Sequence, residues 1–418
     1  MTPHRRHLLS AALGLSLMLA GSILAGSAFA EQLTLERAIS IAREQSPTAQ
    51  IARARVAEAS ARAGQAAAAF YPMLRLTSSY TQSDNPVQVF MFGLNQAEFS
   101  MAGDFNNPPT ADNWQASAVA QYRLFAGGRD LANRRAAKAA ELGMTHMQAA
   151  TDNELTLQVT RSYLSVLTAL EFVRAAEAAV ADFEASERVM NSRVEAGTAL
   201  RTGLLEIQVQ LAQAQERLLQ AQNGLSLAKD SLRLVLGLEE LAINEFGQLD
   251  DVDLPVPPTE SSSERPEVLA RESFAKAAKA EYRSAKGGYL PAINAFGSLD
   301  RYQGWEFDGT NETWTAGLSL EWSIFDGFLT RSQVREKRAQ VTLAEQESRQ
   351  TQLQTSVELT TASLTLRDAT ERVAVMRRAT DLARENVTLT KQRFEQGLML
   401  PSERSEEHTS ELQSRITI

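Results

Sequence analysis

The chain has 418 residues, with 42 Lys and Arg against 51 Asp and Glu, a formal net charge of −9, and no Cys. The acidic balance argues against a nucleic-acid partner, because phosphate binding needs clustered cations. The lack of Cys excludes disulfide bonds and cysteine-linked lipid anchors.

Residues 1–30 are predicted to be a secretory signal. Two cations, Arg5 and Arg6, precede an apolar run, and Ala28-Phe29-Ala30 supplies a small-residue cleavage site. A membrane anchor is the alternative, which the small-residue exit disfavours. After residue 30 no apolar stretch of about 20 residues follows, so no membrane-spanning helix is expected.

The first structural repeat is expected over residues 31–237. Two helices separate at Ser46-Pro47, because the residue before proline disfavours the α region. Pro72 ends the second helix, and the apolar period then changes to two, which predicts a strand over about 73–83. A loop rich in Asn, Pro, Gly and Asp is expected over 84–113.

A second strand is predicted over about 113–126, with an apolar face and a mostly polar face. Gly127 breaks it, and a helix follows over about 129–193. Apolar residues recur in this helix at a mean spacing of about 3.5, the coiled-coil value. At ~1.5 Å per residue the helix would be roughly 95 Å long, more than a globular domain uses.

A return helix over about 204–236 completes this repeat, with Gly197 and Gly203 flanking the turn that precedes it. A Pro- and Ser-rich linker is expected over 238–264. The second repeat is expected over 265–403, and it is incomplete because it lacks the return helix. Its predicted elements are strands over about 291–302 and 313–326 and a long helix over about 329–395.

An internal repeat at an offset of 200 residues sets this architecture before any local interpretation. Both copies pass from a strand into a long helix. The matching residues are Trp114 and Trp314, Phe125 and Phe325, Gly127 and Gly327, Arg193 and Arg393, and Gly197 and Gly397. The strand–helix junctions are marked by Pro72, Gly127, Pro291 and Gly327.

The strands are predicted to lie in a membrane barrel rather than a soluble sandwich. Export is implied by the signal, the strands match an outer-membrane span in length, and aromatic residues lie near their ends. The residues expected to form a lipid-facing aromatic girdle are Trp114, Tyr122, Trp314 and Trp322. Four strands cannot close a barrel, and lipid tolerates no open sheet edge, so several chains must share one barrel.

The sequence resembles the TolC-like outer-membrane efflux family from the mature start to about Glu403. The resemblance rests on Leu33-Thr34-Leu35, on the Phe-Tyr-Pro at 70–72 with Tyr-Leu-Pro at 289–291, and on the strand endings and helix tips of both repeats. It implies a mainly α chain with transmembrane β structure, assembled as a homotrimer with a twelve-stranded β-barrel in the outer membrane and an α-helical tunnel in the periplasm of a Gram-negative bacterium.

The resemblance also implies the function of a passive exit duct, not an enzyme, in a tripartite efflux or type I secretion system. An adaptor protein and an inner-membrane pump of RND or ABC type would open it. The expected adaptor-docking tip residues are Arg193, Gly197, Gly203, Arg393 and Gly397. The two arginines could instead be solvated cations at helix ends. The family often has Asp six residues after the tip glycine, where this chain has Gly203 and Glu403, so acidic gating is unsupported in the first repeat.

Residues 404–414 resemble a translated sequencing adapter, so 404–418 is expected to be artefactual and the natural protein longer; a natural acidic tail is the alternative. Outside this tail and the signal only His146 remains among the histidines, which rules out a His/Cys metal site or a Ser-His-Asp triad, and no cofactor is expected. The competing functional hypotheses are a periplasmic adaptor with one helical hairpin and a soluble coiled-coil scaffold. Substrate and pump class stay open.

Overall fold

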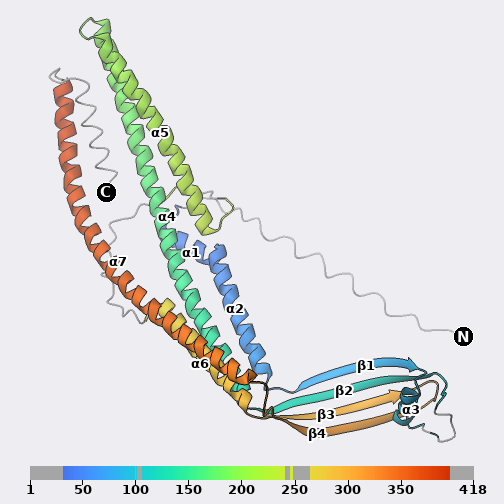
Figure 1. Cartoon of the computed structure of the whole chain (residues 1–418). Helices are drawn as coiled ribbons and strands as arrows, with labels where there is room; N and C mark the ends of the chain where they lie inside the picture. Colours follow the sequence, from blue (N-terminus) through green and yellow to red (C-terminus); the bar gives the residue numbers. More distant parts are fainter. Residues whose placement is uncertain (1–31, 99, 101–105, 241–244, 248–263, 396–418) are drawn as a thin grey trace, which may run out of the picture.

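The computed structural model describes residues 32–98, 100, 106–240, 245–247 and 264–395. The expected signal, the adapter-like tail and Gly397 lie outside these residues. Long helices form one end of the molecule and a single sheet forms the other (Figure 1). The prediction of a mainly helical chain with a small sheet is therefore confirmed.

The elements follow one another in two similar series, each with helix, two strands and a long helix. In chain order they are α1 (Leu35–Gln45), α2 (Pro47–Ala68), β1 (Met73–Ser83), α3 (Pro86–Asn95), β2 (Ala111–Ala126), α4 (Arg129–Glu195), α5 (Arg201–Leu236), α6 (Pro266–Lys286), the 3-10 turn η2 (Gly287–Tyr289), β3 (Ala292–Gln303), β4 (Thr310–Glu321) and α7 (Leu329–Glu395).

The four strands form one antiparallel sheet in the order β1-β2-β3-β4. Two of the three pairings are between consecutive strands of one repeat. The central pairing joins the repeats, with Ala118 opposite Leu299. Among the described strands, β1 and β4 each have a neighbour on one side only, so the sheet has two open edges.

Helix α4 is the central helix at the helical end of the molecule. It packs against α2 and α6 in the half nearer the sheet and against α5 in the far half (Figure 1). Small residues allow the helices to approach closely: Ala63, Ala132 and Ala136 are buried, and a side chain on Gly143 would meet the ring of Phe274 from α6. This explains the alanine-rich composition. Within the described residues, no helix combines the length and apolar character needed to cross a membrane.

Four charged pairs join α6, or the residue before it, to α7. These are Lys337–Glu281 at 2.7 Å, Lys279–Glu345 at 2.8 Å, Arg271–Glu347 at 3.1 Å and Arg265–Glu358 at 3.7 Å. All are partly exposed, so each contributes little, roughly 0–1 kcal/mol. Beyond this zone α7 diverges from α4 and α5 (Figure 1), and apolar side chains such as Leu364 and Leu382 are exposed.

The largest core lies midway along the helices, where α1, α4 and the end of α5 meet. Tyr163 is 1% exposed, and its hydroxyl lies 2.7 Å from the carbonyl oxygen of Leu33 and 2.8 Å from that of Gly247. Phe246 packs edge-on against this ring and forms a parallel bridge with Leu33. The expected irregular linker therefore contributes a buried side chain, that of Phe246, to the core.

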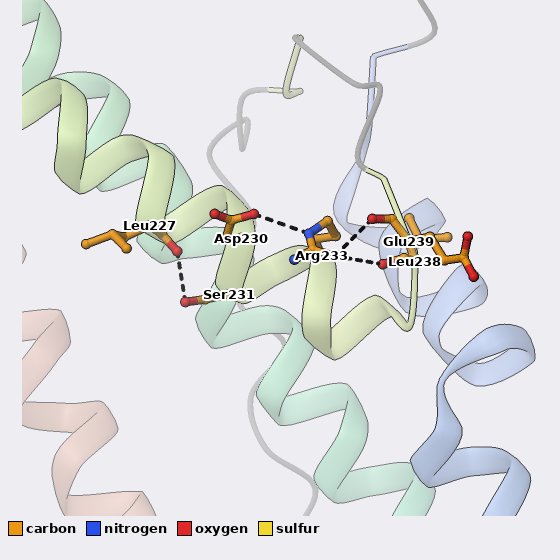
Figure 2. Close-up of polar contacts among 6 residues, drawn as sticks. All are labelled: Leu227, Asp230, Ser231, Arg233, Leu238 and Glu239. Atoms are coloured by element: carbon orange, nitrogen blue, oxygen red, sulfur yellow. Dashed lines mark hydrogen bonds and ion pairs between the residues drawn. The ribbon is translucent and has the colours of Figure 1, made fainter.

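Arg233 fixes the end of α5 in this core. Its guanidinium binds the Asp230 carboxylate at 3.2 Å and donates to the carbonyl oxygens of Glu239 at 2.9 Å and Leu238 at 3.4 Å (Figure 2). Its own carbonyl accepts from the N–H groups that follow the helix. The Arg233 side chain thus holds the two residues Leu238 and Glu239, which follow α5, against the last turn of the helix.

Three sequence predictions about element bounds are wrong. The expected loop over 84–113 contains the helix α3. The strand predicted over 313–326 ends at Glu321, so Trp322 follows the strand. The return helix begins at Arg201 rather than near 204, which places Gly203 inside its first turn.

Candidate functional site

The sheet has two chemically different faces. Residues directly opposite in an antiparallel pair point to the same side, so the register assigns each side chain to a face. The apolar face carries Leu74, Leu76, Tyr80, Trp114, Ala116, Ala118, Ala120, Tyr122, Ala295, Leu299, Trp314, Ala316, Leu318 and Leu320, with Ser78, Arg301 and Glu312 as polar exceptions toward the loop end. Its large side chains are open to the surroundings: Leu76 is 82% exposed and Leu318 is 71% exposed.

The opposite, polar face carries mostly hydroxyl, amide and charged groups. Its members are Arg75, Thr77, Ser79, Gln115, Ser117, Gln121, Asn294, Ser298, Asp300, Thr313, Thr315 and Ser319, with Met73, Val119 and Phe296 as apolar exceptions. Asp300 accepts hydrogen bonds from Ser298 at 2.8 Å and Gln115 at 3.3 Å. The polar face is therefore suited to contact with water.

Three of the four predicted girdle residues lie on the apolar face. Trp114 donates to the Ser78 hydroxyl at 3.0 Å, and Tyr122 and Trp314 are both exposed. Trp314 is opposite Leu299 and in line with Ala118, nearer the middle of the strands than expected. Trp322 lies beyond β4, where its indole donates to the Tyr289 carbonyl at 3.1 Å.

The junction between sheet and helices depends on a close approach of two backbones. Gly127 follows β2 with φ +63°, and a Cβ at this position would overlap the carbonyl oxygen of Gly287 and lie 2.9 Å from Leu290 Cβ. Glycine is thus required both by conformation and by space. Pro72 and Pro291 each stand immediately before a strand, β1 and β3.

In the second repeat, the junction between β4 and α7 has a different structure. Gly327 has φ +65° with open space around it, and Phe328 adopts φ 68° where the first repeat has a glycine. Asp326 caps the start of α7 by accepting hydrogen bonds from the N–H and hydroxyl of Thr330. These bonds hold the pKa of Asp326 below its usual value. Because this pKa is lowered on folding, the stabilisation is present at neutral pH and is lost as pH falls through the folded-state pKa.

The α4–α5 hairpin tip is a compact helix end. Gly197 has φ +72°, and its N–H donates to the Val194 carbonyl at 3.0 Å, while the Thr198 N–H donates to the Arg193 carbonyl at 2.8 Å. This is the Schellman arrangement, in which glycine takes the left-handed position. Gly203 has no such role, because it is helical and a Cβ there would make only ordinary contacts with Met190, at 3.8 Å.

Substitution of the two tip glycines is expected to have opposite effects. Gly197→Ala should destabilise the turn by about 1–2 kcal/mol, the cost of a left-handed alanine, whereas Gly203→Ala should stabilise α5 by roughly 0.5–1 kcal/mol. Hydrogen exchange at the Thr198 amide measures the difference. Faster exchange in Gly203→Ala, or unchanged exchange in Gly197→Ala, would contradict this assignment.

The second expected tip is only partly described. Arg393 lies in the last turn of α7, near its end at Glu395, and Gly397 is outside the described residues. The docking roles of Arg193, Arg393 and the tip glycines remain predictions. In the described part of the chain, no group of three or more His, Asp or Glu side chains could hold a metal ion.

Comparison with known proteins identifies the family that has this arrangement. The family model described as Outer membrane efflux protein matches residues 38–238 and 258–416, most of the chain. The chain belongs to the outer membrane efflux protein family. The family prediction made from the sequence motifs is thereby confirmed. The second match includes residues 404–414, which lie outside the described structure, and their expected artefactual origin stays a prediction.

Individual members of the efflux protein family agree with this assignment. Outer membrane protein OprJ of Pseudomonas aeruginosa is 27% identical over 307 residues, which cover 70% of this chain and 63% of OprJ. The chain therefore spans just under two thirds of that relative's length. The chain is an outer-membrane protein, as its family and relatives are.

Two outer-membrane proteins of known structure share the fold. The CmeC outer membrane channel of Campylobacter jejuni superposes with a TM-score of 0.79 at 14% identity, over 91% of this chain and 81% of that one. The outer membrane protein VceC of Vibrio cholerae gives a TM-score of 0.73 at 18% identity, over 92% and 91%. The efflux-protein fold is thus retained at low sequence identity.

Proposed function

We propose that this protein is the outer-membrane exit duct of an efflux or type I secretion system. The observation that carries the proposal is the exposed apolar face of a four-stranded sheet whose two edge strands are open. An apolar surface of this kind is stable against lipid, and open edges are not. The edges of β1 and β4 therefore pair with those of neighbouring copies.

Three copies give a closed barrel of twelve strands, with the apolar face toward lipid and the polar face toward a water-filled lumen. The helices continue from the sheet as a tunnel through the periplasm. The α4–α5 tip, with Arg193 and the Gly197 turn, lies at the far end and is the proposed contact with an adaptor, and the end of α7 at Arg393 is its counterpart. An energised inner-membrane pump supplies the work of transport.

The periplasmic-adaptor alternative fits less well. An adaptor has one helical hairpin inserted in a small β-domain, whereas this chain repeats a strand pair followed by a long helix, and the two strand pairs join into one sheet. The family match to efflux proteins favours the duct.

The orientation of the sheet is tested by matched arginine substitutions on adjacent residues. Leu318→Arg places a charge on the apolar face and should cost about 2–4 kcal/mol if that residue meets the bilayer interior. Ser319→Arg places the same charge on the polar face and should be nearly neutral. The amount of heat-modifiable oligomer in outer-membrane fractions measures assembly. Equal assembly of both variants would overturn the proposal.

A further inference from the structure

Helix α3 has two apolar sides, and the proposed function uses neither. Its sequence, PVQVFMFGLN, contains no charged residue. One side, with Val89 and Phe92, is buried against Ala111 of β2 and Phe307. On the other side Val87, Met91 and Leu94, spaced four and three apart, are 71%, 46% and 41% exposed. These three residues are termed the α3 stripe below.

The register shows on which side of the sheet α3 lies. Ala111 is two residues before Asn113 and four before Gln115, so all three point to the polar face. Ala111 is fully buried, and it is Val89 and Phe92 that cluster with it. Helix α3 therefore covers the polar face at the loop end of the strands, the end opposite the long helices (Figure 1).

Hydrogen bonds hold α3 in this place. The Asn85 side chain caps the helix by accepting from the Val87 N–H at 3.0 Å. After the helix, the buried amide of Gln96 donates to the Asp112 carbonyl at 2.7 Å and to Asn113 Oδ1 at 3.1 Å. Asp112 in turn accepts from the backbone N–H groups of Trp305 and Glu306 in the β3–β4 turn, at 3.0 and 2.9 Å.

This network ties α3 to both strand pairs. The Gln96 side chain occupies the space beside Gly304, where any Cβ would overlap it. The four hydrogen bonds of this network hold the arrangement, and the Gln96 Oε1 atom is the one buried side-chain oxygen or nitrogen without a partner among the described residues. The α3 stripe is consequently presented in a fixed direction and not carried on a free loop.

We infer that the α3 helices of three copies meet across the outer mouth of the barrel and form an apolar constriction there through the α3 stripe. The inference rests on the proposed trimeric duct, whose lumen is the polar face. With strands ~4.8 Å apart and tilted by ~40°, twelve strands form a barrel of about 12 Å backbone radius. The wall side chains and a helix of ~10 Å diameter together take up most of this radius, so helices attached to the inner wall reach one another near the barrel axis.

The apolar and uncharged character of the α3 stripe favours contact with the same stripe on the other two copies. An apolar surface facing a water-filled lumen gains by burial against another apolar surface, and three uncharged copies meet without repulsion. A ring of apolar side chains excludes water and ions when it is narrow, which is how hydrophobic constrictions gate. The protein would thus have a restriction at its outer end, far from the periplasmic tip.

Because the sequence has no Cys, a single-cysteine variant carries only the introduced thiol. Met91→Cys lies on the α3 stripe, and Thr77→Cys lies on the polar face farther along the wall. A disulfide forms only when the two Cα atoms approach to within roughly 7 Å. On oxidation of the assembled protein in detergent, Met91→Cys should give covalent dimers on a denaturing gel, and Thr77→Cys should give none. Under reducing conditions a water-soluble maleimide should label Met91→Cys about tenfold more slowly than Thr77→Cys, since burial limits thiol access.

Light scattering of the same samples reports the oligomeric state. Trimers without a Met91→Cys cross-link, labelled as fast as Thr77→Cys, would overturn the constriction and leave the exit duct standing. Monomers in both variants would overturn the proposed function together with the constriction. Cross-linking of both variants to the same extent would also overturn it, because it would report random collision.

Discussion

Gly127→Val is expected to destabilise the protein by about 2–5 kcal/mol, since a branched side chain in the left-handed region costs ~1–2 kcal/mol and overpacking against Gly287 and Leu290 adds ~1–3 kcal/mol. The β2–α4 turn crosses the backbone between α6 and β3 at this point, so the added side chain must separate the two repeats. The result should be loss of the assembled oligomer. Thermal unfolding followed by circular dichroism in detergent measures the change.

Gly128→Val is the matched control for this prediction. Gly128 also has a positive φ, +77°, but a Cβ there has nothing within 4 Å. Phe328 adopts a similar backbone conformation 200 residues later, so a bulky side chain is sterically acceptable at this type of position. Gly128→Val should cost only the conformational part, about 1–2 kcal/mol. Equal melting temperatures of the two variants would show that the close approach at Gly127 is unimportant.

Tyr163→Ala is expected to cost about 3–5 kcal/mol, because it leaves a cavity at the junction of α1, α4 and α5. Tyr163→Phe keeps the ring and removes only the hydroxyl that lies beside the carbonyl groups of Leu33 and Gly247, so its cost should be about 0.5–1.5 kcal/mol. Urea unfolding of the detergent-solubilised protein measures both. Tyr71→Ala, at a residue 71% exposed, should be within about 0.5 kcal/mol of the parent.

Burial raises the pKa of Tyr163. Because the folded-state pKa is higher than the unfolded one, the neutral phenol stabilises the fold fully below the unfolded pKa, and this stability is lost as pH rises through the folded pKa. Tyr163→Phe should therefore lose less stability than the parent in strong alkali. A core that unfolds identically in both proteins across the alkaline range would contradict the central position given to this hydroxyl.

Much of the fold is predictable because prolines and changes in the apolar period occur at the boundaries of helices and strands. Pro47, Pro72 and Pro291 stand where helices or strands begin, and the change of apolar period from about 3.6 to 2 separates helix from strand. The face of each strand side chain also follows from alternation alone. These signals are local, so a single sequence is enough to find them.

The errors arise where contacts between residues far apart in the sequence determine the structure. Trp322 and Ile324 continue the alternation of β4, but the partner strand β3 begins at Ala292, opposite Glu321, so no ladder exists beyond that pair. The buried role of Phe246 depends on Leu33, more than 200 residues away in the sequence. Neither partner is identifiable from the residues around the error.

Helix α3 was missed for a different reason. Its Asn85-Pro86 start is a recognisable cap followed by a first-turn proline, but the many Gly, Asn and Pro residues around it favoured a loop. The side on which it packs is set by Ala111 and by the anchoring of Gln96 between two turns. Only the assembled sheet shows these contacts, on which the inferred outer constriction rests.

The seam between β2 and β3 also determines the order of folding. Strands within each repeat are close in sequence and can form hairpins early, whereas Ala118 finds Leu299 only after the intervening helices have brought the repeats together. Such non-local pairing is slow, because the entropy of closing a long loop must be overcome first. Each chain is therefore expected to hold two separate half-sheets, with their leucine side chains exposed, until the seam closes.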